Sequence, residues 1–183
     1  MPSPSTRQIL TEAEVTRTLE RLASEIVEHH AHEEHEGTLA LIGIQRRGVE
    51  LADRLRQLLK ARLGQEVPLG KLDINLYRDD WTTLESQPRI NHTDIPFAVD
   101  NSHCILVDDV LYTGRTIRSA LEAILDFGRP RRVELLVLVD RGHRELPIHA
   151  DYIGKRVHTS CRERVDVEIR ERDGHDAVVL TEV

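Results

Sequence analysis

The segment ILVDDVLYTGRTI (residues 105–117) constrains the fold more than any other part of the chain. It begins as an apolar strand, continues into the adjacent acids Asp108 and Asp109 and a Gly/Thr turn, and ends in a helix. In open α/β sheets, ligands bind just beyond the carboxyl ends of the strands. A helix N-terminus at that edge offers free N–H groups and a positive dipole end to an anion. The segment therefore predicts a site for a ligand with hydroxyls or a metal at one end and a phosphate at the other, such as a ribose phosphate.

The rest of the chain alternates strand patterns with helix patterns. We expect strands at 39–44, 69–77, 105–108, 133–139, 152–153, 165–169 and 177–180, and helices at 9–29, 49–59 and 117–125. This order favours an α/β fold with a mainly parallel sheet flanked by helices. Right-handed crossovers then place the turns after the strands at 39–44, 105–108 and 133–139 on one edge of the sheet.

Two of the helices carry clear boundary signals. Thr11 followed three residues later by Glu14 is the pattern of a capping box for the first helix. The helix at 117–125 has apolar residues recurring at one-turn spacing, which predicts one buried stripe made of Ile117, Ala120, Leu121, Ile124 and Leu125. Gly128, with Pro130 just beyond it, is expected to end that helix in a left-handed conformation.

Length and composition indicate one globular domain over residues 1–183, with residues 1–8 disordered. No apolar run approaches the roughly 20 residues of a membrane helix. Cys104 and Cys161 are too few for a disulfide framework, which favours a reducing cytosol. The histidine- and glutamate-rich segment 29–37 matches no known ligand spacing and is expected to be a solvated connector, although chance affinity for divalent ions stays open.

The formal net charge of −7 argues against nucleic-acid binding over the whole surface. This charge does not exclude a local basic patch, because arginines cluster at several points of the chain. Residues 79–97 show no periodic pattern, and a loop this long in a compact domain is more often functional than idle.

Alternatives to a ribose-phosphate site explain the central segment less well. A P-loop enzyme requires a Gly-x-x-x-x-Gly-Lys-Ser/Thr run, which the sequence lacks. Phospho-acceptor domains carry their acidic pair near the N-terminus. A purely structural helix cap leaves Thr113, Gly114 and Thr116 unexplained, whereas two hydroxyls beside a glycine suit a bound phosphate.

The run from Val107 to Thr116 resembles the phosphoribosyl-pyrophosphate (PRPP) signature of the type I phosphoribosyltransferases. Within them, the segments 76–80, 110–116, 139–148 and 150–155 resemble one family closely, over about residues 8–170. That family is PyrR, whose members are bifunctional: each is both an attenuation regulator of the pyrimidine operon and a uracil phosphoribosyltransferase. The resemblance implies a central mainly parallel sheet flanked by helices with a small hood.

The resemblance also implies two activities and their partners. One is the Mg²⁺-dependent reaction of uracil with PRPP to give UMP and pyrophosphate. The other is binding of the pyrimidine-operon leader mRNA in the presence of UMP or UTP, which promotes termination. Members are cytoplasmic and form homodimers or homotetramers. Two alternatives stay open: a nucleotide-sensing RNA-binding regulator with little catalysis, and a purine-salvage phosphoribosyltransferase.

The family's site residues fall on matching positions of this sequence. Asp108 and Asp109 would hold the ribose hydroxyls directly or through Mg²⁺, itself bound mainly by substrate and water. Arg47 would stabilise the departing pyrophosphate and, with these two acids, is the expected catalytic set. The substrate-binding set implied by the resemblance further comprises Arg46, Arg78, Val110, Leu111, Tyr112, Thr113, Gly114, Arg115, Thr116, Arg141 and Val165.

Other implied roles concern the loop and the RNA. The loop 79–97 would close over the reacting centre, although Asn91 stands where members carry Lys or Arg. The candidate RNA contacts are Arg17, Arg21, Arg162 and Arg164. Glu20, Ser24 and Cys161 depart from the neutral or basic residues often found in the family's RNA-facing positions.

Overall fold

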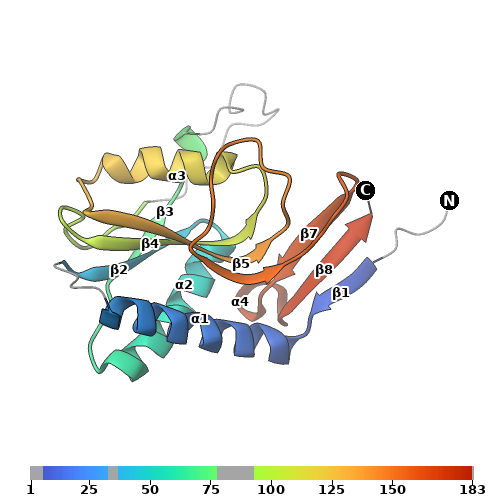
Figure 1. Ribbon diagram of the computed structural model, residues 1–183, viewed down its shortest axis with the longest axis horizontal. Helices are drawn as coiled ribbons and strands as arrows, with labels where there is room; N and C mark the ends of the chain where they lie inside the picture. The colour runs from blue at the N-terminus through green and yellow to red at the C-terminus, as the bar shows by residue number, and fades with distance from the viewer. Residues whose placement is uncertain (1–5, 33–36, 78–92, 183) are drawn as a thin grey trace.

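The computed structural model describes residues 6–32, 37–77 and 93–182. Its main element is a five-stranded sheet in which every neighbouring pair of strands is parallel, in the order β3-β2-β4-β5-β6 (Figure 1). The strands are β2 (Leu39–Ile44), β3 (Leu69–Leu72), β4 (His103–Leu111), β5 (Arg132–Asp140) and β6 (Tyr152–Arg156). The predicted α/β class and parallel sheet are confirmed.

Helices cover both faces of this sheet. Figure 1 shows α1 (Glu12–His32) and α2 (Arg47–Leu63) on one face and α3 (Arg115–Leu125) on the other. All six residues of β2 are buried, as expected for a parallel strand covered on both sides. Because α2 follows β2 and α3 follows β4, the turns that open these helices lie at the same sheet edge, as predicted.

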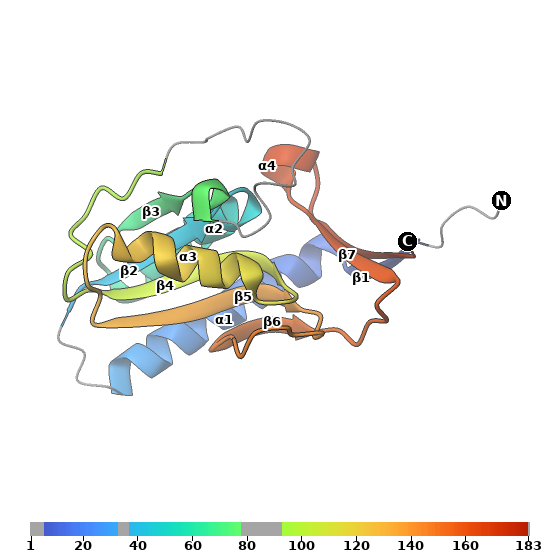
Figure 2. The ribbon, with the colours of Figure 1, turned by 90° about the horizontal axis from the view of Figure 1, so that it is seen from above.

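A second, smaller sheet, which we call the hood, packs against that edge. It consists of β1 (Thr6–Leu10), β8 (Ala177–Glu182) and β7 (Glu163–Glu168), paired antiparallel in this order (Figure 1). The short helix α4 (Arg170–Asp173) connects β7 to β8 (Figure 2). Arg54 of α2 joins the hood through Asp176 at 2.7 Å and Glu171 at 2.6 Å.

The N-terminal segment differs from the prediction. Residues 6–8, expected to be disordered, form part of β1 and pair with β8, so that expectation is wrong for them. The first helix begins at Glu12 rather than residue 9. Its capping box is confirmed: the backbone N–H of Thr11 donates to Glu14 Oε2 at 2.8 Å, and the N–H of Glu14 donates to Thr11 Oγ1 at 3.4 Å.

The third strand is also shorter than predicted. It ends at Leu72, and Asn75–Tyr77 forms a 3₁₀ turn, η1. The cause is local, because Asp73 Oδ1 accepts a hydrogen bond from the backbone N–H of Asn75 at 2.9 Å, which turns the chain. The apolar alternation through residue 76 therefore does not mark strand residues.

The buried stripe of α3 is narrower than its spacing predicted. Ile117, Ala120 and Ile124 are buried, but Leu121 and Leu125 are 37% and 62% exposed. The reason is that α3 is the only described α-helix on its face of the sheet, so its flank has no neighbouring helix. The helix ends at Leu125, with Asp126 as its cap. Gly128 has a positive φ of +146° but lies beyond that cap, so the prediction that it ends the helix is wrong. No helix in the described ranges is long and apolar enough to cross a membrane.

Candidate active site

The acidic pair lies near the end of β4, which runs three residues beyond the predicted strand. Asp108 is buried and Asp109 is half-buried. Asp108 Oδ1 accepts a hydrogen bond from the backbone N–H of Asp109, and Asp109 Oδ1 accepts one from the N–H of Val110, both at 2.9 Å. Burial, together with the neighbouring Asp109 carboxylate, raises the pKa of Asp108 well above its usual range. Such a buried acid is typical of a functional site.

The turn after β4 leads directly into α3. Gly114 caps the helix with φ +93°, a left-handed conformation that a β-substituted residue adopts only with strain. The hydroxyl of Thr113 accepts a hydrogen bond from the N–H of Arg115 at 3.3 Å. The first N–H groups of an α-helix have no acceptor within the helix, so the start of α3 is chemically suited to an anion. Thr116 is exposed on this first turn.

The turn between β2 and α2 reaches the same place. Gly48 lies so close to β4 that a Cβ atom there would meet the carbonyl oxygen of Val107 at 2.3 Å. The peptide bond preceding Arg46 is cis. Arg46 is exposed, whereas Arg47 is half-buried and pairs with Asp173 of α4 at 3.2 Å. The structure thus brings the turn that carries Arg47, the residue expected to stabilise the pyrophosphate, beside the aspartate pair.

Arg141, after β5, completes the group. It is buried, and its guanidinium lies 4.0 Å above the ring of Tyr112. Its Nη2 donates to the carbonyl oxygen of Glu163 at 2.6 Å, two residues before Val165 on β7. A cavity of about 330 Å³ opens here, lined by residues 140–144 and 156–159. Arg141 therefore lies beside the start of β7, the strand that carries Val165.

Some members of the predicted set contribute differently or lie outside the described residues. Leu111 is buried in the core, so only its backbone can face a ligand. The side chain of Arg115 donates to Glu145 at 2.7 Å. Arg78 lies outside the described residues, as does most of the loop 79–97, including Asn91.

The candidate RNA contacts lie on two separate elements. Arg17 and Arg21 are exposed on α1, and Arg21 donates to the carbonyl oxygens of Ile153 and Gly154 at 3.2 and 2.6 Å. Arg162, in the turn just before β7, and Arg164, on β7, are also exposed, and Arg164 pairs with Asp166 at 2.7 Å. Arg21 therefore also fastens α1 to β6.

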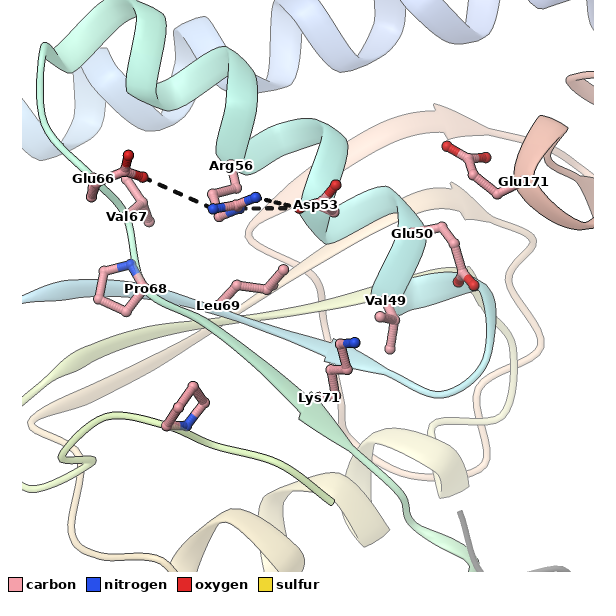
Figure 3. Close-up of a pocket in the computed structure, with 11 residues that line it drawn as sticks. Val49, Glu50, Asp53, Arg56, Glu66, Val67, Pro68, Leu69, Lys71 and Glu171 are labelled. Atoms are coloured by element: carbon pink, nitrogen blue, oxygen red, sulfur yellow. Dashed lines mark hydrogen bonds and ion pairs between the residues drawn. The ribbon is translucent and has the colours of Figure 1, made fainter. Parts of the chain in front are cut away.

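A larger cavity lies elsewhere. It measures about 710 Å³ and is lined mainly by α2, β3 and the segment between them (Figure 3). Its acidic groups are already matched by arginines. Asp53 and Glu66 lie 2.8 and 3.9 Å from Arg56, and Glu171 lies 2.6 Å from Arg54. We assign no ligand to this cavity.

The donor set of the site fits a loosely held magnesium ion. Within the described ranges, no group of three or more His, Cys, Asp or Glu side chains is arranged to bind a metal. Asp108 and Asp109 alone supply two carboxylates. Mg²⁺ retains several waters and is often held by one or two carboxylates together with substrate phosphates, so the pair matches this mode of binding.

Comparison with known proteins decides the family. Residues 5–168 match the family described as "Phosphoribosyl transferase domain". A "Bifunctional protein PyrR" of Pelotomaculum thermopropionicum is 54% identical over 175 residues, covering 96% of this chain and 95% of the relative. The protein of the same name from Thermus thermophilus is 53% identical with the same coverage. The chain belongs to the PyrR family.

Solved structures agree with this assignment at the level of the fold. The hypoxanthine phosphoribosyltransferase of Trypanosoma cruzi superimposes with a TM-score of 0.70 at 19% identity, covering 97% of both chains. The type I phosphoribosyltransferase fold expected from the resemblance is confirmed.

Two residues of this PyrR-family site were not found from the sequence. Asp173 pairs with Arg47, and Arg144 donates a hydrogen bond to the backbone of the turn after β4. Asp173 is 126 residues away from Arg47, so no local pattern links them. Arg144 lies in one of the family motifs, but only the fold shows that it reaches the carbonyl oxygen of Tyr112.

Proposed function

We propose that this chain transfers the phosphoribosyl group of PRPP to uracil, giving UMP and pyrophosphate, and that it regulates pyrimidine-operon transcription. One observation carries the enzymatic part. The Asp108–Asp109 pair lies between two turns that each lead into a helix, one into α3 at Gly114 and the other into α2 at Arg47, and both turns are suited to an anion. PRPP has this order of groups, with a phosphate and a diphosphate flanking the ribose hydroxyls.

Each part of the site has a task in this reaction. Asp108 and Asp109 accept hydrogen bonds from the ribose hydroxyls and orient the sugar. The N–H groups around Gly114 bind the 5′-phosphate. As the bond to the leaving group breaks, positive charge develops on the ribose carbon and negative charge on the pyrophosphate. The guanidinium of Arg47 stabilises the latter charge. Bound Mg²⁺ supplies Lewis-acid neutralisation of the pyrophosphate.

The uracil ring would occupy the cavity beside Arg141. Its walls include the backbone of residues 140–144 and 156–159, which offers donors and acceptors to a pyrimidine edge. The hood closes this side through the hydrogen bond from Arg141 to Glu163. A closing loop at 79–97 would exclude water from the activated ribose.

The regulatory part of the proposal is UMP- or UTP-dependent binding of the operon's leader mRNA. Arg17 and Arg21 on α1, Arg162 just before β7 and Arg164 on β7 are its proposed contacts. A nascent transcript as partner implies that the protein acts in the cytoplasm. RNA binding does not require a basic protein overall, since a few contacts with RNA phosphates supply most of the affinity for the RNA.

We also propose that the chain forms a homodimer or homotetramer. Exposed apolar side chains on and just beyond α3 support this, because Leu121 and Leu125 of the helix are 37% and 62% exposed and Phe127, two residues after its end, is 45% exposed. A second copy that covers this surface would remove the apolar area from water.

The decisive experiment is a product assay. Purified protein is incubated with Mg²⁺, PRPP and either uracil or hypoxanthine, and nucleotides are separated by chromatography. UMP formation supports the proposal. Inosine monophosphate formation would instead identify a purine-salvage enzyme. Absence of turnover together with tight UMP binding would leave only the sensing and RNA-binding role.

The RNA role needs a separate measurement. A stem-loop from the leader upstream of this protein's own operon is titrated with protein, with and without UMP. Tighter binding with UMP supports the regulator. An affinity that UMP leaves unchanged contradicts it.

A further inference from the structure

Arg144 lies behind the turn that follows β4, on the side away from the proposed phosphate. It is half-buried and donates to five acceptors from three segments of chain. These are Tyr112 O at 2.6 Å, Asp140 Oδ1 at 2.6 Å, Ile148 O at 3.1 Å, Gly142 O at 3.3 Å and Leu111 O at 3.4 Å.

Neighbouring backbone N–H groups continue the same pattern. The N–H of Arg141 donates to Leu111 O at 3.1 Å, and those of Glu145 and Leu146 donate to Thr113 O at 2.9 and 3.1 Å. The carbonyl oxygens of residues 111, 112 and 113 therefore all point toward the segment 140–148.

This orientation has a consequence for the opposite side of the turn. In a planar trans peptide, the C=O of one residue and the N–H of the next point in opposite directions. When the three carbonyls face Arg144 and its neighbours, the N–H groups of Tyr112, Thr113 and Gly114 face away from them. Successive N–H groups that point to one side form a concave site for an anion.

We propose that Arg144 is a positioning residue for the 5′-phosphate of PRPP and UMP, acting through the backbone of residues 111–114 rather than by touching the ligand. This inference rests on the proposed function. Arg144 turns the carbonyl oxygens, which would repel a phosphate, away from the ligand and holds the N–H groups toward it.

An arginine suits this task better than a lysine. The planar guanidinium carries five N–H donors in a fixed fork and can reach several acceptors at once, whereas a lysine ammonium has three donors around one atom. Asp140 holds the guanidinium of Arg144 in place. Its Oδ1 accepts a hydrogen bond from Arg144 at 2.6 Å and another from the backbone N–H of Gly142 at 3.0 Å. Burial alone would raise the pKa of Asp140, but these hydrogen bonds lower it, so the carboxylate stays charged.

The test compares three ligands that use different parts of the site. UMP and ribose 5-phosphate both carry the 5′-phosphate, but only UMP reaches the uracil cavity, which Arg144 also lines; inorganic pyrophosphate with Mg²⁺ is expected to bind at the Arg47 turn. All three are titrated by calorimetry into wild-type protein, Arg144→Ala and Arg144→Lys. We expect Arg144→Ala to weaken UMP and ribose 5-phosphate alike, about tenfold or more, because the carbonyl oxygen of Tyr112 loses its donor and the turn relaxes. Arg144→Lys should lie between, and pyrophosphate affinity should stay within about twofold.

Kinetics provide a second readout. With uracil saturating, the KM for PRPP should rise in both variants by more than kcat falls, since the loss concerns binding of the phosphate. The matched control is Arg132→Lys, at the other end of β5, where the arginine pairs with Glu134 at 2.7 Å. This variant should change neither UMP affinity nor KM.

The outcomes separate this inference from the function on which it rests. If the wild-type protein neither binds UMP nor makes it, the proposed function fails and the inference fails with it. If wild type is active and a folded Arg144 variant binds UMP normally, only the inference is overturned. Equal weakening of UMP and pyrophosphate would assign Arg144 a general structural role and also overturn it. Weakening of UMP without weakening of ribose 5-phosphate would assign Arg144 to the uracil cavity and overturn it as well. Should Arg144→Ala not fold, Arg144→Lys decides.

Discussion

Replacing both acids of the site by asparagine should uncouple catalysis from stability. Asparagine has nearly the same shape as aspartate, and its side-chain oxygen can still accept the hydrogen bond from the backbone N–H that Asp108 now receives at 2.9 Å. The fold of β4 should therefore be retained in Asp108→Asn/Asp109→Asn. Only the negative charge that receives the ribose hydroxyls is lost.

The expected loss of activity follows from those hydrogen bonds. A hydrogen bond to a charged partner contributes about 1.5–3 kcal/mol. Two of them give about 3–6 kcal/mol, which corresponds to a fall of about 10²–10⁴-fold in kcat/KM. UMP synthesis should become barely measurable.

The expected change in stability has the opposite sign. Burial and the charge of Asp109 raise the pKa of Asp108 in the folded protein, so ionisation of Asp108 opposes folding. This unfavourable contribution is absent below about pH 4, where the carboxyl is protonated in both states, and grows as the pH rises through the raised pKa. At neutral pH the variant should gain about 0.5–2 kcal/mol, or about 1–8 °C in Tm.

Two assays check this prediction. Calorimetric melting at several pH values measures Tm, and chromatography of the reaction products measures UMP. Asp100→Asn is the matched control: Asp100 lies at the other edge of the sheet, and its Oδ1 accepts from the N–H of Arg129 at 2.7 Å. This control should keep full activity. Full activity of the double variant would refute the site, and a Tm below wild type at neutral pH would refute the burial argument.

Three further outcomes are expected. Arg47→Ala should lower kcat by about 10²–10³-fold because one donor to the leaving group is lost; a normal kcat would contradict this role. Leu125→Glu should shift the assembly to a smaller mass in light scattering, since it places a charge on the apolar surface of α3; an unchanged mass contradicts that surface. Arg17→Ala should flatten the log–log salt dependence of leader-RNA binding by about 0.7–0.9, the value of one phosphate contact, and an unaltered slope excludes Arg17 as a contact.

The main sheet could be predicted because its strands carry their own signals. Continuous apolar runs such as residues 39–44 are long enough to be buried on both faces, and turn residues bound them. The hood had no such signal at its N-terminal strand. Residues 6–10 become a strand only by pairing with β8, about 170 residues later in the sequence. Their own composition therefore does not predict that they form a strand.

The site could be predicted in part for a related reason. Asp108, Gly114 and Thr113 follow one another in the chain, so their pattern is visible in a single segment. The contacts of Arg47 with Asp173 and of Arg144 with Tyr112 depend on how separate segments meet. Likewise, the spacing of Leu121 and Leu125 predicts a helix face correctly but cannot show whether anything covers that face.

The arrangement of the site bears on how synthesis and regulation are related. UMP is both the proposed product and the proposed effector, and it would use the aspartate pair and the turn at Gly114, so changes there should impair both activities. Arg47 differs, because it faces the pyrophosphate, which UMP lacks. Arg47→Ala should therefore lower the kcat of synthesis by about 10²–10³-fold and leave UMP-stimulated RNA binding intact. If RNA binding in this variant no longer responds to UMP, the nucleotide must contact the α2 turn as well, and the division of the site into two anion-binding turns is wrong.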